Sequence, residues 1–503
     1  MLVFIARRLF ISVLVFFSAT ALVYVMAANL GDPLADLREL PPDDREAAIA
    51  DRTERMNLDK PVVARYFLWL GSVLTGDLGT NRTGQDVNGM LDRAIGATLQ
   101  LVLAATILSI VVGVGIGVIS ALRQYSGLDL GVTFGAFVCF SLPVFWVGTL
   151  LKQYGAIEFN NWLGDPSIAW WVIGLIAVFT GMVFSSLLMG DRRTRLTAFA
   201  GSAAIMAVLL TVLSATGWFS DPGLGIVVIT LSAGAAAVGF ATLFGGLEWS
   251  ATMKASAAAA VIGVVCALTL GPVLRDPEWW TILLLGVITA AVCFALGHVI
   301  GGVLHRRTAI PAAMLTGLFT GGVIFVDRML QSFADYSDSV RGRPIGTIGP
   351  STPNYEGTFW EHGLNSFGHL ALPTMTLLLI SLASYSRYSR ASMLEVMNQD
   401  YVRTARAKGL PERAVITRHA FRNGLIPITT LVAYDIGTVL GGAVVTETVF
   451  GWRAMGDLLI TGINERDPNP VMAFFLVAGA AIVIFNMVAD VVYAYLDPRI
   501  RLS

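Results

Sequence analysis

Residues 94–122 read AIGATLQLVLAATILSIVVGVGIGVISAL, a stretch without one acidic or basic side chain. A helix rises about 1.5 Å per residue, so about 20 such residues cross a hydrocarbon layer about 30 Å thick. A backbone in lipid must satisfy its own hydrogen bonds, and this stretch lacks the alternation of a barrel strand. It therefore predicts a membrane-spanning helix. Gly113, Gly115 and Gly117 within it favour close helix packing over phosphate binding.

The composition of the whole chain supports a membrane protein. Hydrophobic residues make up 55% of the 503 residues and charged residues 14%, whereas soluble domains carry about 25% charged residues. The formal net charge of −1 gives no indication of a nucleic-acid partner. Cys139, Cys266 and Cys293 lie in apolar runs, which predicts buried thiols. No catalytic, cofactor or metal site is predicted.

Similar uncharged runs recur along the chain and predict an all-α polytopic membrane protein. The run 9–30 follows Arg7 and Arg8 and is long enough to span the bilayer, so we interpret it as a retained helix rather than a secretory signal. In all, the sequence predicts about twelve transmembrane helices, at 9–30, 94–122, 130–151, 166–190, 196–220, 222–247, 255–274, 279–304, 308–326, 366–386, 425–446 and 471–489.

Basic residues predict the orientation, because Lys and Arg are enriched on cytoplasmic segments. With the N-terminus inside, Arg7, Arg8, Arg123, Lys254 and Arg306 all fall on inner segments. Both termini are therefore predicted to be cytoplasmic. Three polar segments interrupt the membrane pattern: outer segments at 31–93 and 327–361 and a large inner loop at 387–424.

A block in the middle of the chain, 165–326, suggests three tandem helical hairpins. An Asp-Pro pair opens each one, at Asp165, Asp221 and Asp276, with spacings of 56 and 55 residues. Such a period indicates duplicated units, although short-looped helices also show rough periodicity and Pro is common at helix starts. Six helices can be removed without changing the remaining topology, so the block is predicted to be an insertion.

The inner loop 387–424 carries the strongest functional signal. Residues 390–408 have a helical composition, and Gly409 and Pro411 are stop signals. A second short helix is expected over about 412–421. A helix–Gly–helix unit on the cytoplasmic side is suited to docking a partner protein.

Together with this loop, motifs along the chain resemble the dipeptide/oligopeptide permease family of ABC importers. The resemblance covers roughly 1–151 and 362–503, and not 152–361. The motifs that carry it are Arg7-Arg8-Leu9, Gly31-Asp32-Pro33, Leu58-Asp59-Lys60-Pro61, Gly76-Asp77-Leu78-Gly79, Ala97-Thr98-Leu99, Ser141-Leu142-Pro143, Phe145-Trp146, Leu372-Pro373-Thr374, Glu447-Thr448-Val449-Phe450 and Leu496-Asp497-Pro498-Arg499-Ile500.

The resemblance implies a six-helix permease core, with six inserted helices added to it. Residues 1–30 would be the first transmembrane helix, and 94–151 with 362–503 the rest of the core. The coupling segment in loop 387–424, which would dock into a partner ATPase, is Arg403, Thr404, Ala405, Arg406, Ala407, Lys408, Gly409 and Leu410.

The implied partners supply the energy and the cargo. The sequence contains no Gly-x-x-x-x-Gly-Lys-Ser/Thr phosphate loop, so ATP and Mg would be bound by partner ATPase subunits and no cofactor by this chain. The resemblance implies a heterodimer with a second, homologous permease, two ATP-binding subunits and an extracellular lipoprotein or periplasmic binding protein. Membrane lipids are the remaining partner, and the expected location is the bacterial plasma (inner) membrane.

Asp435 is the candidate pathway residue, because it lies deep in the run 425–446. An acid at membrane depth is costly and is usually functional or paired. It could line the pathway and meet a cationic group such as a peptide amine, or it could be protonated and hydrogen-bonded to a neighbouring helix. Pro143 and Pro373 are further candidates for lining the pathway.

Two matters stay open at this point. An ion-gradient-driven secondary transporter also has about twelve spans, although such proteins show two similar halves, and the two halves of this chain show no such similarity. The cargo could be a dipeptide, a longer peptide, a metal chelate or a haem-like compound, since the family handles all of these.

Overall fold

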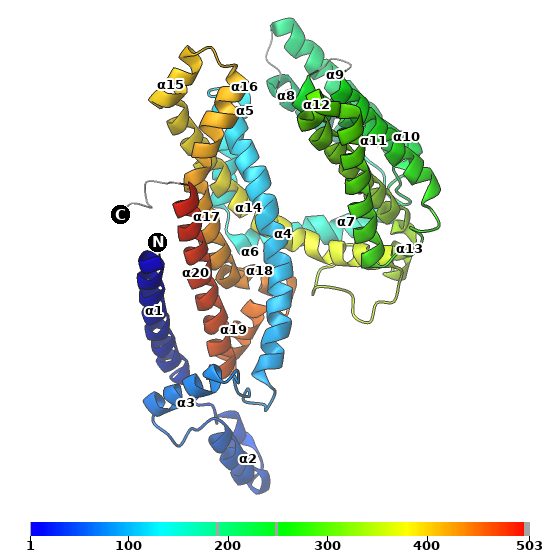
Figure 1. Ribbon diagram of the computed structural model, residues 1–503. Helices are drawn as coiled ribbons and strands as arrows, with labels where there is room; N and C mark the ends of the chain where they lie inside the picture. Colours follow the sequence, from blue (N-terminus) through cyan, green and yellow to red (C-terminus); the bar gives the residue numbers. More distant parts are fainter. Residues whose placement is uncertain (1, 188–190, 247–249, 497–503) are drawn as a thin grey trace. The chain divides into compact units, whose positions relative to one another are not determined.

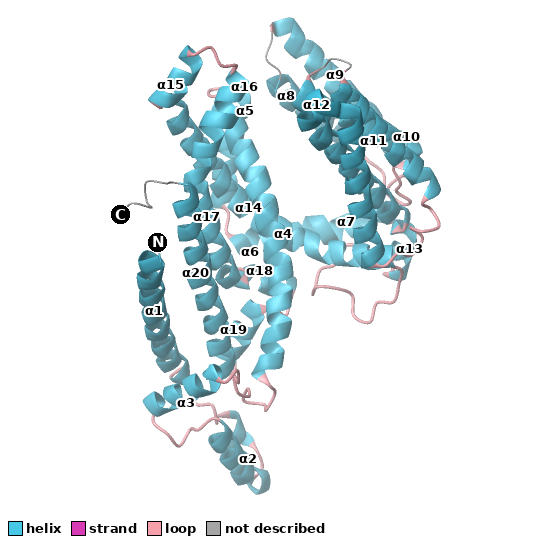
Figure 2. Cartoon of the chain, viewed as in Figure 1, coloured by secondary structure: helices cyan, strands magenta, loops and turns pink. Residues whose placement is uncertain are grey.

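The computed structural model describes residues 2–187, 191–246 and 250–496. Within these residues every named element is a helix, and the strand-like geometry is confined to an isolated bridge between Thr80 and Asp86 (Figures 1 and 2). The prediction of an all-α protein is therefore confirmed for the described part of the chain.

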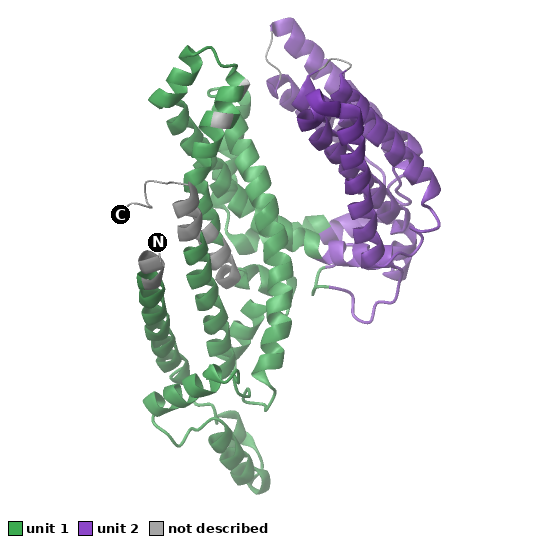
Figure 3. Cartoon of the chain, viewed as in Figure 1, with its two compact units in different colours: residues 1–155, 347–350, 370–503 green, residues 156–346, 351–369 purple. Residues whose placement is uncertain are grey.

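The chain divides into two compact units (Figure 3). Unit 1 contains residues 1–155, 347–350 and 370–503, and unit 2 contains 156–346 and 351–369. The predicted block 165–326 falls inside unit 2. Whether that block is an accessory insertion stays a prediction.

The elements follow the apolar runs closely. The first part of the chain forms α1 (Leu2–Ala28), η1 (Asp36–Glu39), α2 (Pro42–Arg55), α3 (Val62–Leu74), α4 (Val87–Leu122), α5 (Gly127–Ser141), α6 (Val144–Leu150) and the π-helical η2 (Leu151–Glu158). The middle part forms α7 (Phe159–Leu163), α8 (Trp170–Leu187), α9 (Arg192–Ala215), α10 (Gly225–Gly245), α11 (Ala251–Thr269), α12 (Trp279–Gln331) and α13 (Phe333–Ser339). The last part forms α14 (Phe359–Met397), α15 (Asp400–Ala407), α16 (Glu412–Ala414), the π-helical η3 (Val415–Ala420), α17 (Phe421–Gly442), α18 (Val444–Phe450), α19 (Met455–Asn464) and α20 (Pro468–Leu496).

Helices α4 and α14 of unit 1 approach each other closely at two glycines of α4. A Cβ added at Gly113 would lie 2.7 Å from Cβ of Tyr385, and one added at Gly117 would lie 2.5 Å from the backbone oxygen of Ser386. Both glycines therefore permit close helix packing, as predicted. Gly115 takes no part in such packing, because a Cβ there would meet no atom within 4 Å.

The predicted span 130–151 is not one straight helix. Helices α5 and α6 are bent by 102° at the break between them. Pro143 immediately precedes α6, with extended φ and ψ of −61° and 139°. A proline cannot donate a hydrogen bond to the preceding turn, so it begins a new helix more readily than it continues one.

Helix α12 is a hairpin rather than one long rod. Gly302 has φ 51° and ψ −159°, a conformation that side chains rarely adopt. A Cβ at Gly297 would lie 2.5 Å from Cα of Ile310, so the two arms pack backbone to backbone. These arms correspond to the predicted spans 279–304 and 308–326.

Nine helices among the described residues are long and apolar enough to cross a membrane, or ten if the bent pair beginning with α5 counts as one span. The chain is therefore a polytopic membrane protein. That count takes α12 as one helix and leaves out α17, which matches the predicted span 425–446. The ends of the predicted spans 166–190 and 222–247 lie outside the described residues. Twelve spans and the orientation of the termini stay predictions.

The glycine contacts of α4 predict that two glycine-to-alanine substitutions on this helix have opposite effects on thermal stability. Gly117→Ala should lower the thermal midpoint of the purified protein, because overpacking costs about 1–3 kcal/mol. Gly115→Ala, two residues away on the same helix, is the matched control and should leave or raise the midpoint, since glycine in a helix costs about 0.5–1 kcal/mol relative to alanine. Equal midpoints for the two variants would contradict the packing described here.

Candidate functional site

The predicted coupling segment forms a short helix with a well-defined end. Just past the end of α15, the N–H of Leu410 donates to the carbonyl oxygen of Ala405 (3.4 Å), and the N–H of Gly409 donates to that of Arg406 (2.9 Å). Gly409 has φ 76°. These are the features of a Schellman motif, which needs a left-handed residue after the helix. Gly409 is therefore the stop signal that the sequence predicted.

The expected single helix over 390–408 is wrong. Helix α14 extends beyond its apolar run and ends at Met397. Asn398 and Gln399 are not helical, and α15 begins after them. Gln399 has an extended ψ of 149°, which turns the chain. The coupling segment is thus a separate helix attached to the end of α14.

One face of α15 is anchored and the other is free for contact. Val402, Ala405 and Val415 are buried together, with Val396 and Met397 packed against them. Of the eight predicted coupling residues, Ala405 is therefore part of the support. The other seven are exposed: Arg403, Thr404, Arg406, Ala407, Lys408, Gly409 and Leu410.

An ion pair holds the turn after α15. Nη2 and Nε of Arg406 lie 2.7 and 3.2 Å from the two carboxylate oxygens of Glu412. The hydrogen bond from Arg406 lowers the pKa of Glu412 below its usual value. Exposed ion pairs contribute at most about 1 kcal/mol, so the pair chiefly fixes how α16 follows α15.

A buried clamp joins the extension of α14 to α4 and α5. Nε and Nη2 of Arg390 lie 2.6 and 2.9 Å from the two carboxylate oxygens of Asp129. The hydroxyl of Ser120 and the N–H of Tyr125 also donate to this carboxylate, whose side chain is 4% exposed. Sequence reasoning missed Asp129, because an acid next to the end of an apolar run resembles an ordinary interfacial residue.

Asp435 contacts a neighbouring helix. The hydroxyl of Tyr385, a fully buried residue of α14, donates to the Asp435 carboxylate at 2.9 Å. Ser381 also hydrogen-bonds this carboxyl group. Hydrogen bonding to a neighbouring helix is one part of the second alternative given for Asp435, whereas its protonation and a role in the pathway stay predictions. Tyr385 was not predicted.

The two candidate prolines lie in different settings. Pro143 is exposed at the break between α5 and α6, and Pro373 is buried inside α14. Their assignment to the pathway stays a prediction.

Two of the sequence motifs meet in space although they are 349 residues apart. The hydroxyl of Thr98 in α4 donates to Glu447 in α18 at 2.7 Å. The N–H of Gly456 donates to the same carboxylate, and the N–H of Met455 donates to Thr98 Oγ1 at 3.0 Å. Glu447 is 1% exposed. This buried network joins α4, α18 and α19 at one point.

A second hydrogen-bond network joins the predicted outer segment 31–93 to the residues around the start of α20. The backbone N–H groups of Arg82 and Asn469 donate to Asp467, which is fully buried. Nη1 of Arg82 donates to the carbonyl oxygen of Glu465 at 2.8 Å. Burial raises the pKa of Asp467. The closing motif at 496–500 lies outside the described residues except for Leu496.

Comparison with known proteins assigns the chain to a family. Residues 279–502 match the family described as binding-protein-dependent transport system inner membrane component. A putative peptide permease protein of Brucella ovis is 38% identical over 225 residues, which cover 40% of this chain and 68% of that protein. The chain belongs to this family of peptide permeases. The resemblance noted from the motifs is thereby confirmed.

Full-length similarity extends over the rest of the permease. The oligopeptide transport system permease protein OppB of Mycobacterium tuberculosis is 25% identical over 500 residues, covering 99% of each chain. The oligopeptide transport system permease protein AppB of Bacillus subtilis is 24% identical over 506 residues, covering 100% of each. The permease is thus similar to transport subunits rather than to catalytic ones.

The clamp gives a stability prediction. Asp129→Asn should destabilise the permease by about 3 kcal/mol, because removal of one partner leaves Arg390 partly buried without its counter-charge. Replacing both residues, as Asp129→Asn with Arg390→Met, should cost less than the two single changes added together. Thermal unfolding of the purified protein measures these effects.

A surface ion pair supplies the control. Arg55 and Asp51 on α2 are 2.6 Å apart, with side-chain exposures of 32% and 63%, so Asp51→Asn should cost at most about 1 kcal/mol. If the stability losses of the two single variants simply added up in the double variant, Arg390 and Asp129 would not stabilise each other.

Proposed function

We propose that the permease is the membrane subunit of an ATP-driven importer that takes up dipeptides or oligopeptides delivered by a binding protein. Its family membership supports an importer, and the names of its relatives support a peptide cargo. The observation that carries the coupling role is the geometry of α15, which is anchored on one face and exposed on the other.

The coupling would work as a lever. A partner ATPase docks on the exposed face of α15 and moves it when ATP binds. Since Val402 and Ala405 pack on the end of α14, the force reaches α14 directly. The Arg390–Asp129 pair then transmits it to α4 and α5. A rigid lever that biases two arrangements of the membrane helices is a recognised type of switch.

The remaining subunits follow from the same proposal. Two ATPases bind the ATP and Mg, and this chain carries no ATPase site or cofactor. A second, homologous permease completes the pathway, and an extracellular lipoprotein or periplasmic protein delivers the peptide. The complex lies in the bacterial plasma membrane.

The inserted block is a further part of the proposal. The Brucella relative is shorter than this chain, because 225 aligned residues make up 68% of it. A shorter relative agrees with an insertion somewhere in this chain, and 165–326 is the segment that we propose for it. Deleting the block should leave assembly and import intact if it is an accessory, and should abolish them if it forms part of the core.

Purification tests the function as a whole. The tagged permease, extracted gently from its native membrane, should bring with it a second permease and ATPase subunits that mass spectrometry identifies. In reconstituted vesicles, peptide uptake should require ATP. Uptake driven by an ion gradient without ATP would instead make the protein a secondary transporter.

Photo-crosslinking tests the coupling segment. A photoreactive side chain at Ala407, exposed on α15, should crosslink to an ATPase subunit in the assembled complex. The same group at Ala50, an exposed alanine of α2 in the predicted outer segment, should not. Crosslinking from Ala50 but not from Ala407 would sink the docking proposal.

A pathway that includes Asp435, Pro143 and Pro373 is also proposed, with Asp435 as its charged member. Asp435→Asn should slow peptide import and change its pH dependence, because the carboxylate would no longer meet a peptide amine. Asp338→Asn, a change at an exposed acid of α13, should alter neither property. Unchanged import by Asp435→Asn, with a lowered thermal midpoint, would leave the residue with only a packing role.

A further inference from the structure

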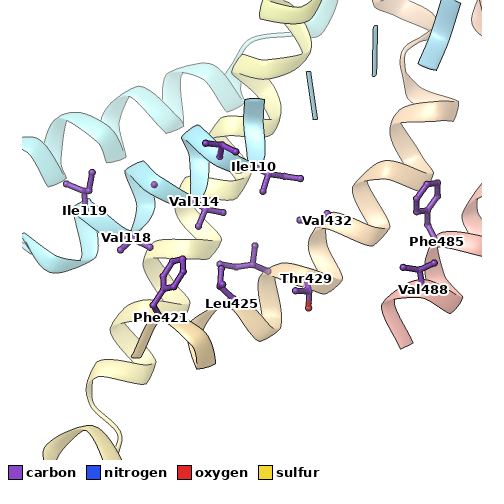
Figure 4. Close-up of a pocket in the computed structure, with 13 residues that line it drawn as sticks. Ile110, Val114, Val118, Ile119, Phe421, Leu425, Thr429, Val432, Phe485 and Val488 are labelled. Carbon is purple, nitrogen blue, oxygen red and sulfur yellow. The ribbon is translucent and has the colours of Figure 1, made fainter. Parts of the chain in front are cut away.

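An apolar groove of about 720 Å³ runs between α4, α17 and α20. Figure 4 shows its lining: Ile110, Val114 and Val118 come from α4 and face Leu425 and Val432 of α17, with Phe485 and Val488 contributed by α20. A volume between 300 and 1,000 Å³ is typical of sites for small molecules. The groove is therefore large enough for a defined ligand.

Gly115 deepens this groove. It belongs to the lining, and a Cβ there would meet no atom within 4 Å. Gly113 and Gly117 on the same helix contact α14 instead. Close packing against α14 thus explains Gly113 and Gly117. Gly115 instead lines the groove, where a side chain would occupy open space.

Among the lining residues that the structure describes, Thr429 alone carries a side-chain hydroxyl, and it already donates to the carbonyl oxygen of Ile426 at 2.7 Å. A peptide in the groove would lose the hydrogen bonds its amides make with water, at a cost of several kcal/mol for each amide. The groove therefore suits a hydrocarbon chain and not the transported peptide.

Two arginines lie next to lining residues in the chain, at the end of the groove where α4 ends and α17 begins. The lining residues Ile119 and Phe421 lie near the end of α4 and at the start of α17. Arg422 follows Phe421 directly and is exposed, and Arg123 comes one turn after Ile119, just past the end of α4. Basic pockets between membrane helices on the cytoplasmic side bind anionic lipid headgroups.

We propose that this groove binds one phospholipid with an anionic headgroup. Its acyl chain lies over Gly115 between α4, α17 and α20, and its phosphate lies at Arg422 and Arg123. The apolar lining selects a hydrocarbon chain, and the charge at the end of the groove selects an anionic lipid over a zwitterionic one.

Native mass spectrometry of the full chain, purified with its accompanying subunits, tests this proposal. The protein is depleted of lipid and then exposed to an equal mixture of phosphatidylglycerol and phosphatidylcholine with identical acyl chains. The unsubstituted protein should retain phosphatidylglycerol preferentially. Arg422→Gln should reduce this preference about fivefold, since one basic residue near the surface contributes about 1 kcal/mol.

Filling the groove separates a bound lipid from surrounding ones. Gly115→Phe should abolish retention of the lipid, whereas Gly131→Phe, at a glycine of α5 that also has open space around it, should not. Arg192→Gln, at an exposed arginine of α9, should leave the preference unchanged. Gly115→Leu repeats the test with a smaller side chain, and the thermal midpoint confirms that each variant is folded.

Two results would overturn the proposal. One is equal retention of the two lipids by the unsubstituted protein. The other is retention by folded Gly115→Phe protein as strong as by Gly131→Phe protein. Either would show that the groove holds only the lipids that surround any membrane helix.

Discussion

The ion pair between the buried Asp129 and the partly buried Arg390 is the constraint on which the coupling geometry depends. Taking two charges out of water is expensive, and the attraction repays the cost only when every donor and acceptor is satisfied. Here Asp129 accepts from Nε and Nη2 of Arg390, from the hydroxyl of Ser120 and from the N–H of Tyr125. Breaking any one of these contacts would leave a charged or polar group without its partner, at a cost in free energy. The contacts therefore hold α14, α4 and α5 together at the point where α14 continues toward α15.

The sequence predicted the helices well and their interruptions less well. Apolar runs locate most helices because the membrane leaves the backbone no alternative. Gly409 was recognised as a stop because a left-handed residue after a helix favours glycine. The break at Asn398 and Gln399 carries no glycine or proline, so no local signal separated α14 from α15. Pro143 is a known helix breaker, but the uncharged residues on both sides of it predict one continuous span.

The candidate site was predictable one residue at a time but not as a set of contacts. The sequence marks Asp435 as a candidate because an acid is rare at membrane depth, but it does not identify Tyr385 as the hydrogen-bond partner. Thr98 and Glu447 lie in separate motifs, and only the fold brings them to 2.7 Å. Such pairs depend on how helices pack, which residue spacing along a single helix does not determine.

The three alternate glycines of α4 show how one residue type serves two purposes. Residues four apart lie on the same helix face, and residues two apart lie on nearly opposite faces. Gly113 and Gly117 therefore meet α14, while Gly115 opens onto the groove. Ser120, which donates to Asp129, belongs with the face that meets α14. A lipid over Gly115 would thus press on α4 from the side opposite the clamp, so that the bilayer and the coupling helix would act on the same element.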